Sequence, residues 1–202
     1  QIKVGSQTLA TYAYTNLKDK NLQKLTYGNG DYVSYLYDEY SRVTKETYED
    51  GKYVAYRYDN DGFLASVQDS ETGRITSYSY DLSGRLAKYR EKGSSLDHSV
   101  SYEYDQKNNL SKQTEKIGSA TYTTDYSYDE DNRIKNLTSD LGTADTADDL
   151  TVVYSYDALG RLDKQELKKS TAADAETADG FITREYTYRE NADGSKTTGQ
   201  VA

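Results

Sequence analysis

The sequence of 202 residues contains no cysteine, proline, methionine or tryptophan. Without cysteine there can be no disulfide, no thiol nucleophile and no thiolate metal site. This fits a secreted protein that does without cross-links, although it does not fix the compartment. No apolar run approaches the roughly 18 residues that a spanning helix needs, so we expect no membrane insertion. The chain starts on Gln1 rather than Met, so we expect it to be a fragment of a longer protein.

Charge and composition narrow the class further. The formal net charge is -9, which disfavours nucleic acid as a partner. Hydrophobic residues make up only 35% of the chain, and tyrosine supplies 23 of them. Tyrosine favours strands and combines an apolar ring with a polar tip. This composition favours a single-layer sheet whose two faces both stay partly wet.

A Tyr-x-Tyr motif recurs along the chain, as in YSYDLSGRL at residues 78–86 and YSYDALGRL at residues 154–162. Such a period indicates a repeat architecture. Aligned on the second tyrosine, the eight units are centred on Tyr14, Tyr37, Tyr58, Tyr80, Tyr104, Tyr128, Tyr156 and Tyr188.

Each unit carries two turn signals. The first follows the second tyrosine, as in Asp81-Leu82-Ser83-Gly84, where Asp first and Gly fourth predict a type I turn. A left-handed fourth residue would close a three-residue hairpin with a bulge. The second signal is a glycine at the other end of the strand pair. Other fourth-position residues are Ser41, Asn108 and Asn132, and the second glycines are Gly30, Gly51, Gly73, Gly93, Gly118 and Gly180.

Two turns per unit predict an all-β fold, a single-layer antiparallel meander of about 15–16 strands across residues 1–202. Strand twist should curl it into a spiral or partial shell. Two Ala/Asp/Thr-rich insertions, residues 138–150 and 168–180, are expected to form long loops.

The turn also predicts the strand register. Asp81 should pair with Arg85, Tyr80 with Leu86, and Tyr78 with Lys88. The same arithmetic predicts the pairs Asp38–Arg42, Asp129–Arg133 and Asp157–Arg161, and tyrosine–apolar pairs at 37/43, 58/64, 104/110, 128/134 and 156/162. One face would then carry the tyrosines, with Lys45, Lys88, Lys112 and Lys164 beside them, and the other face the Asp–Arg pairs.

Candidate chemistry is sparse. His98 has Asp97, Ser95 and Ser99 nearby, but consecutive residues in a hairpin loop do not build a catalytic triad. The acidic clusters at 59–61, 129–131 and 145–149 could offer oxygen ligands to Ca²⁺, but they lack a known calcium-loop pattern. Two carboxylates placed for glycoside hydrolysis would be no evidence of catalysis here, because so many acidic residues can come close by chance. We therefore expect no catalytic residue, metal or cofactor, and no enzyme.

The pattern Tyr-x-Tyr-Asp-x-x-Gly-Arg-Leu closely resembles the YD repeat of the Rhs family, from residue 12 to 188. That family includes bacterial polymorphic toxins, Gram-positive wall-associated proteins, components of insecticidal toxin complexes, and teneurins. The end copies depart from it, with Thr15 and Arg189 in place of Asp. The resemblance implies a spiralling sheet that closes into a shell, which sequesters a toxic C-terminal polypeptide or supports adhesion. The plug segment of such proteins is Pro-rich, so we expect repeats only here.

The residues that carry the expected structural repeat signature are Tyr35, Tyr37, Asp38, Arg42, Tyr56, Tyr58, Asp59, Gly62, Tyr78, Tyr80, Asp81, Gly84, Arg85, Leu86, Tyr102, Tyr104, Asp105, Tyr126, Tyr128, Asp129, Arg133, Tyr154, Tyr156, Asp157, Gly160, Arg161 and Leu162.

The sequence thus predicts a non-enzymatic structural module of a secreted or cell-surface, wall-associated protein. Its expected partners are the remaining repeats and plug of the parent protein and an enclosed toxin. The alternative is an adhesion or carbohydrate-binding module that uses exposed tyrosine faces. Exposed edge strands would also invite self-association.

Overall fold

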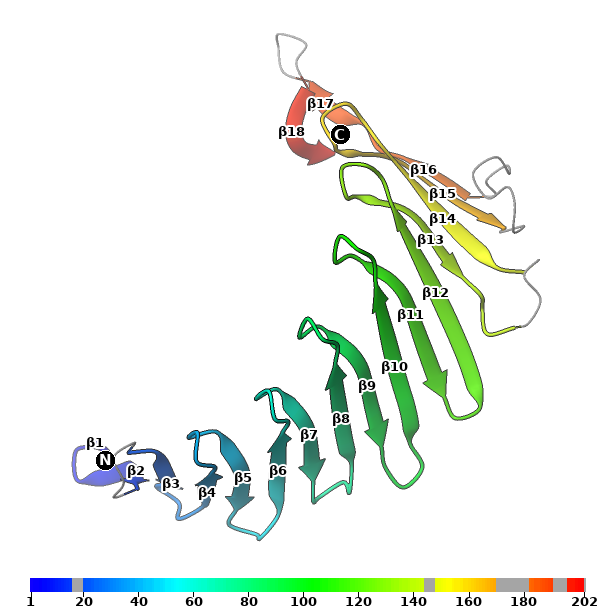
Figure 1. The fold of residues 1–202 in the computed structure, drawn as a ribbon. Helices are drawn as coiled ribbons and strands as arrows, with labels where there is room; N and C mark the ends of the chain where they lie inside the picture. The colour runs from blue at the N-terminus through cyan, green and yellow to red at the C-terminus, as the bar shows by residue number, and fades with distance from the viewer. Residues whose placement is uncertain (16–19, 144–147, 170–181, 191–195, 202) are drawn as a thin grey trace. The chain divides into compact units, whose positions relative to one another are not determined.

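The computed structural model describes residues 1–15, 20–143, 148–169, 182–190 and 196–201. These residues form strands and turns, and the described part contains no helix that could cross a membrane. Sixteen strands, β1 to β16, form one antiparallel sheet in which the strand order follows the chain (Figure 1). Strands β17 and β18 form a separate pair. The predicted all-β meander is confirmed, while its spiral course stays a prediction.

The chain divides into two compact units, residues 1–99 and 100–202. The division falls within β10 (Asp97–Tyr104). The strands of the first unit before β10 are β1 (Ile2–Val4), β2 (Gln7–Tyr14), β3 (Leu22–Tyr27), β4 (Tyr32–Tyr37), β5 (Val43–Tyr48), β6 (Tyr53–Tyr58), β7 (Leu64–Asp69), β8 (Ile75–Tyr80) and β9 (Leu86–Lys92).

The second unit continues the meander. Its strands after β10 are β11 (Leu110–Ile117), β12 (Ala120–Tyr128), β13 (Ile134–Ser139), β14 (Leu150–Tyr156), β15 (Leu162–Lys169), β16 (Ile182–Glu185), β17 (Tyr188–Glu190) and β18 (Lys196–Val201). Strand β15 extends two residues into the insertion expected at 168–180, and the rest of that insertion lies outside the described residues.

The turn after each second tyrosine is organised by its aspartate. The Asp81 carboxylate accepts hydrogen bonds from the backbone N–H groups of Ser83 (2.8 Å) and Arg85 (3.0 Å). The guanidinium of Arg85 donates to its other oxygen at 2.7 Å. The backbone N–H of Asp81 donates to the Arg85 carbonyl at 2.9 Å, which confirms the predicted pair.

The same pair occurs in three other turns. The guanidinium Nε–carboxylate distances are 2.7 Å for Arg42–Asp38, 2.7 Å for Arg133–Asp129 and 2.8 Å for Arg161–Asp157. In the turn after Tyr104, the Asn109 side chain donates to Asp105 at 3.0 Å and takes the place of the arginine. The predicted register at the turns is therefore confirmed.

The fourth turn residue has a positive φ, as predicted. The angle is +77° at Gly84, and non-glycine residues adopt the same conformation with +62° at Ser41, +69° at Asn108 and +68° at Asn132. Asparagine tolerates this region better than most residues, because its short polar side chain can hydrogen-bond locally. The turn geometry is thus kept where the glycine is replaced.

The sheet has almost no dry core. Among the residues whose burial the structure describes, the buried hydrophobic ones are Ala10, Val33 and Val100, each at most 9% exposed. Strand β8 shows the usual state, with Tyr78 and Tyr80 half-buried on one face and alternate residues exposed on the other. A single layer has no second layer to cover its faces, so most of its side chains stay half-buried or exposed.

Two glycine substitutions separate backbone strain from crowding. At both Gly73 (φ +66°) and Gly84 (φ +77°), an alanine has to adopt a left-handed backbone, which costs about 1–2 kcal/mol. A Cβ at Gly84 would also lie 3.0 Å from the Phe63 ring, whereas nothing lies within 4 Å at Gly73. We expect Gly84→Ala to lower the free energy of unfolding more than Gly73→Ala, by about 1 kcal/mol, in urea titrations. Equal losses would show that Phe63 is not held against this turn.

Candidate functional site: the tyrosine face

Strand alternation places the tyrosines of each Tyr-x-Tyr motif on one face, called here the tyrosine face. Its register at the turn is as predicted, because Tyr80 lies opposite Leu86 and Tyr128 opposite Ile134. The remaining pairs of this kind that the structure describes are Tyr14–Leu22, Tyr37–Val43, Tyr58–Leu64 and Tyr156–Leu162.

One residue further from the turn, the prediction is wrong. Tyr78 lies opposite Tyr89, and Lys88 lies opposite Ser79, because the register shifts between Ser79 and Tyr80. The extra residue is Ala87, a β-bulge that moves all following side chains of β9 to the other face. The lysines expected beside the tyrosines therefore lie on the opposite face of the sheet. Besides Lys88, this applies to Lys45, which pairs with Leu36, and to Lys164, which pairs with Ser155. Lys112 lies on the same face and pairs with Asp125.

The second tyrosine of a motif links its unit to the preceding one. Its hydroxyl donates to a backbone carbonyl, which belongs to the apolar residue that faces the preceding second tyrosine. The distances are 2.7 Å for Tyr37 to Leu22, 3.0 Å for Tyr58 to Val43, 3.0 Å for Tyr80 to Leu64, 2.8 Å for Tyr128 to Leu110, 2.8 Å for Tyr156 to Ile134 and 2.8 Å for Tyr188 to Leu162. We call this contact the tyrosine link.

The ring of the linking tyrosine is covered by the turn of the preceding unit. The guanidinium of Arg42 lies 4.3 Å from the ring centre of Tyr58, and Phe63 stacks on Tyr80 with ring centres 4.7 Å apart. Arg133 and Arg161 lie over Tyr156 and Tyr188 at 4.5 and 4.1 Å. We expected the Asp–Arg pairs on the face away from the tyrosines, and this was wrong. The cation–π attraction draws these guanidinium groups over the rings.

The fourth turn residue also leaves room for the side chain that covers the tyrosine ring. A Cβ at Gly62 would lie 3.2 Å from the Arg42 guanidinium, and one at Gly160 would lie 3.1 Å from that of Arg133. Where the covering residue is Asn109, the next turn carries Asn132 instead, and its side-chain amide donates to Asn109 at 2.9 Å. Glycine therefore leaves room for Arg42, Phe63 and Arg133 at Gly62, Gly84 and Gly160.

Carboxylates among the tyrosines raise the phenol pKa values. Glu46 accepts hydrogen bonds from the hydroxyls of Tyr56 (3.2 Å) and Tyr48 (3.4 Å). Partial burial and the nearby Glu46 charge together raise the pKa of Tyr56 to about 12. The pKa of Tyr89 is also about 12, through burial and its hydrogen bond to Glu91. The phenols of Tyr56 and Tyr89 thus stay protonated and can donate hydrogen bonds to these carboxylates.

Asp97, the acidic neighbour of His98 in the sequence, forms an ion pair with Arg90 at 2.8 Å. His98 lies half-buried in β10 rather than in a loop, and its ring meets Tyr89 edge-on at 6.0 Å between centres. Within the described ranges, no group of three His, Cys, Asp or Glu side chains could hold a metal ion. Part of the acidic run at 145–149 lies outside the described residues.

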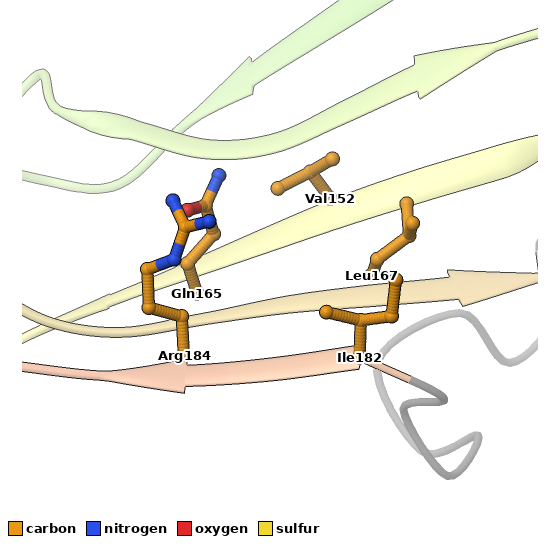
Figure 2. Close-up of a pocket in the computed structure, with 5 residues that line it drawn as sticks. All are labelled: Val152, Gln165, Leu167, Ile182 and Arg184. Atoms are coloured by element: carbon orange, nitrogen blue, oxygen red, sulfur yellow. The ribbon is translucent and has the colours of Figure 1, made fainter.

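A shallow hollow of about 240 Å³ lies on the tyrosine face of the second unit. Val152, Leu167 and Ile182 from β14, β15 and β16 form its apolar wall (Figure 2). Gln165 and Arg184, which face each other across β15 and β16, bound one end. The hollow can take an apolar side chain but presents no group that could act on it chemically.

Residues 58–95, which include the turn at Asp81, match the family model described as RHS Repeat. The matched stretch is therefore an RHS repeat. No curated protein matches it in sequence. Described by its contacts, one RHS repeat here is a hairpin closed by the aspartate turn and joined to its neighbour by the tyrosine link.

Solved structures share this fold. The TcdB2-TccC3 complex matches with a TM-score of 0.63 and 16% identity, over 87% of this chain and 10% of that chain. The complex with Cdc42 matches at 0.62 and 17%, over 87% and 10%. The Photorhabdus luminescens Tc holotoxin pore matches at 0.61 and 17%, over 87% and 9%. The chain therefore spans about a tenth of the length of the chains that it resembles.

The expected signature residues fall into two groups. The Tyr-x-Tyr tyrosines and Leu86 or Leu162 lie on the tyrosine face, and the aspartates, glycines and arginines lie in the turns. The signature did not include Phe63, Asn109 or the linking carbonyls. The carbonyls could not be identified, since any residue has a backbone acceptor. The one signal for the link was the recurrence of a tyrosine, rather than any aromatic residue, at the second motif position.

The tyrosine link can be tested by removing one hydroxyl. Tyr156→Phe keeps the ring under Arg133 but leaves the Ile134 carbonyl without its donor, so the free energy of unfolding should fall by about 1 kcal/mol. Tyr154→Phe, in the same strand, removes a hydroxyl outside the link and should change it by less than about 0.5 kcal/mol. Urea unfolding measures both. Equal effects would contradict the link.

Stability should fall at both ends of the pH scale. Hydrogen bonds from Arg161 lower the pKa of Asp157 from 3.8 to about 2, so its contribution is complete above pH 3.8 and is lost toward pH 2. The raised pKa of Tyr56 has the opposite sign: its contribution is complete below pH 10 and is lost toward pH 12. Far-UV circular dichroism and tyrosinate absorbance should show a stable plateau between these limits. Unfolding near pH 7–8 would contradict this.

Proposed function

We propose that this chain is part of the wall of a shell that encloses a toxin or effector polypeptide. Its RHS repeats form a structural module, and the tyrosine link is the observation that carries the proposal. Each link joins one hairpin to the next through a backbone carbonyl, so the same contact can extend a wall over any number of repeats. A wall of this kind needs no catalytic group of its own.

The single layer supports this role. With few buried hydrophobic residues, both faces remain accessible, one to an interior and one to the surroundings. The fold likeness to TcdB2-TccC3 and to a Tc holotoxin pore supports a toxin-related setting. We infer a large secreted or surface protein in which residues 1–202 form one run of repeats. Its partners would be the further repeats, a plug segment and the enclosed polypeptide.

Adhesion is the second candidate. Several tyrosines of the tyrosine face are well exposed, with Tyr14 at 55%, Tyr27 at 47% and Tyr48 at 37%. Exposed aromatic faces can stack on sugar rings. Under this alternative, the face would bind carbohydrate of a cell surface rather than line a container.

Protease protection distinguishes the two functions. In the intact parent protein, we expect the polypeptide that follows the repeats to resist trypsin, while the same polypeptide expressed alone is digested. A variant with three links removed, Tyr58→Phe, Tyr80→Phe and Tyr156→Phe, should lose this protection. Equal digestion of the enclosed and the free polypeptide would overturn the shell. Micromolar binding of cell-wall fragments, measured by titration calorimetry, would favour adhesion.

A further inference from the structure

The face of the first unit opposite the tyrosine face has an uneven charge. We call it the lysine face and define it by the cations of its strands, which are Lys24, Lys45, Arg57, Lys88, Arg90 and Lys92. Among the described strand residues of this face from β3 to the start of β10, Asp97 is the single acidic one. The acidic side chains of these strands instead lie on the tyrosine face, as Glu46, Asp69 and Glu91. The bulges create this separation.

These cations lie at the surface, and the acidic residue among them pairs with Arg90. Arg90 binds both carboxylate oxygens of Asp97, at 3.0 and 2.8 Å, which uses up that anion. The ammonium groups of Lys24 and Lys45 lie 3.5 and 4.1 Å from the ring centres of Tyr32 and Tyr53. A ring face holds an ammonium in place without cancelling its charge. These two lysines are therefore positioned for a further anion.

The second unit provides an internal comparison. Its lysines at the equivalent positions are matched by acids on the same face. Lys112 pairs with Asp125 at 3.1 Å, and Lys164 pairs with Glu166 at 2.8 Å. The excess of positive charge is thus a property of the first unit and not of the repeat itself.

Apolar side chains lie among these cations. Leu36 is 61% exposed and Ile75 is 42% exposed, and the small side chains of Ser77 and Ser79 lie beside Ile75 in the same strand. Nothing in the described first unit covers them. A polymer that carries only charge would leave these two side chains exposed to water, whereas a polypeptide can offer them apolar partners.

Charge spacing also favours a polypeptide. Lys24 and Lys45 are two strands apart, about 10 Å, and Lys45 and Lys88 are four strands apart with Arg57 between them, so an extended chain spans these steps in about three and six residues. Duplex DNA carries a charge every ~1.7 Å, which is far denser than the spacing of these cations. We propose that the lysine face of the first unit binds an acidic polypeptide segment, with its carboxylates on the lysines and its apolar side chains on Leu36 and Ile75. This does not depend on the chain being the wall of a shell.

Fluorescence anisotropy tests the proposal. The probe is a labelled peptide of about 18 residues with Glu at every third position and Leu and Ser between, extended to about 60 Å. We expect the variant Lys88→Gln/Arg90→Gln/Lys92→Gln to bind it at least about tenfold more weakly at low salt. The control Lys52→Gln/Arg74→Gln/Lys107→Gln removes the same charge outside this face and should change binding less than about twofold.

A second variant and two further ligands distinguish loss of binding from misfolding and from binding of other polymers. Lys88→Gln/Lys92→Gln leaves the Arg90–Asp97 pair intact and should still weaken binding about threefold to fivefold, which excludes misfolding as the cause. The proposal is overturned if the unsubstituted protein does not bind at millimolar peptide, or if both triple variants lose affinity equally. It is also overturned if a peptide with Gln in place of Glu binds equally well. Tighter binding of single-stranded DNA of equal charge would identify a surface for phosphate polymers instead.

Discussion

The hydrogen bond from the second tyrosine of a motif to a carbonyl of the preceding unit is the contact on which the arrangement of the repeats depends. A single-layer sheet has no second layer against which to pack, and the buried hydrophobic residues are few. Backbone ladders join neighbouring hairpins along part of their length, as between β5 and β6, but they do not hold together the ends of the hairpins that carry the aspartate turns. The tyrosine link does so, since one side chain supplies an apolar ring to the surface and a donor to the neighbouring backbone. Phenylalanine could not serve both purposes.

The aspartate turn and the bulge prepare this contact. The turn fixes the second tyrosine opposite an apolar residue, whose carbonyl then receives the next hydroxyl, as Leu64 does between Tyr58 and Tyr80. The bulge that follows moves the lysines to the far face and brings Glu46 and Glu91 among the tyrosines. One extra residue per repeat therefore decides which charges each surface carries. What each face can bind therefore depends on how the bulges distribute the charged side chains between the two faces.

Much of this was predictable from the sequence. The turns, their left-handed fourth residues and the Asp81–Arg85 pair follow from local residue chemistry, and the structure has all of them. The placement of Lys88 was wrong, because the side on which a bulge inserts its extra residue depends on the ladder of both strands. The stacking of Arg42 on Tyr58 and the acceptor role of backbone carbonyls could not be predicted, since they join residues about 16 positions apart across unit boundaries. Local residue chemistry predicts each hairpin. Contacts between hairpins can be predicted only after the strand register, including the bulge, is known.

Native-state hydrogen exchange of the Tyr156→Phe chain tests the central claim most directly. If the link holds neighbouring hairpins together, the amides of β12 and β13 should exchange faster as well as those of β14 and β15, because both sides of the link are released. The account predicts this joint loss of protection across the two hairpins. Faster exchange confined to β14 and β15, with β12 and β13 unchanged, would contradict it.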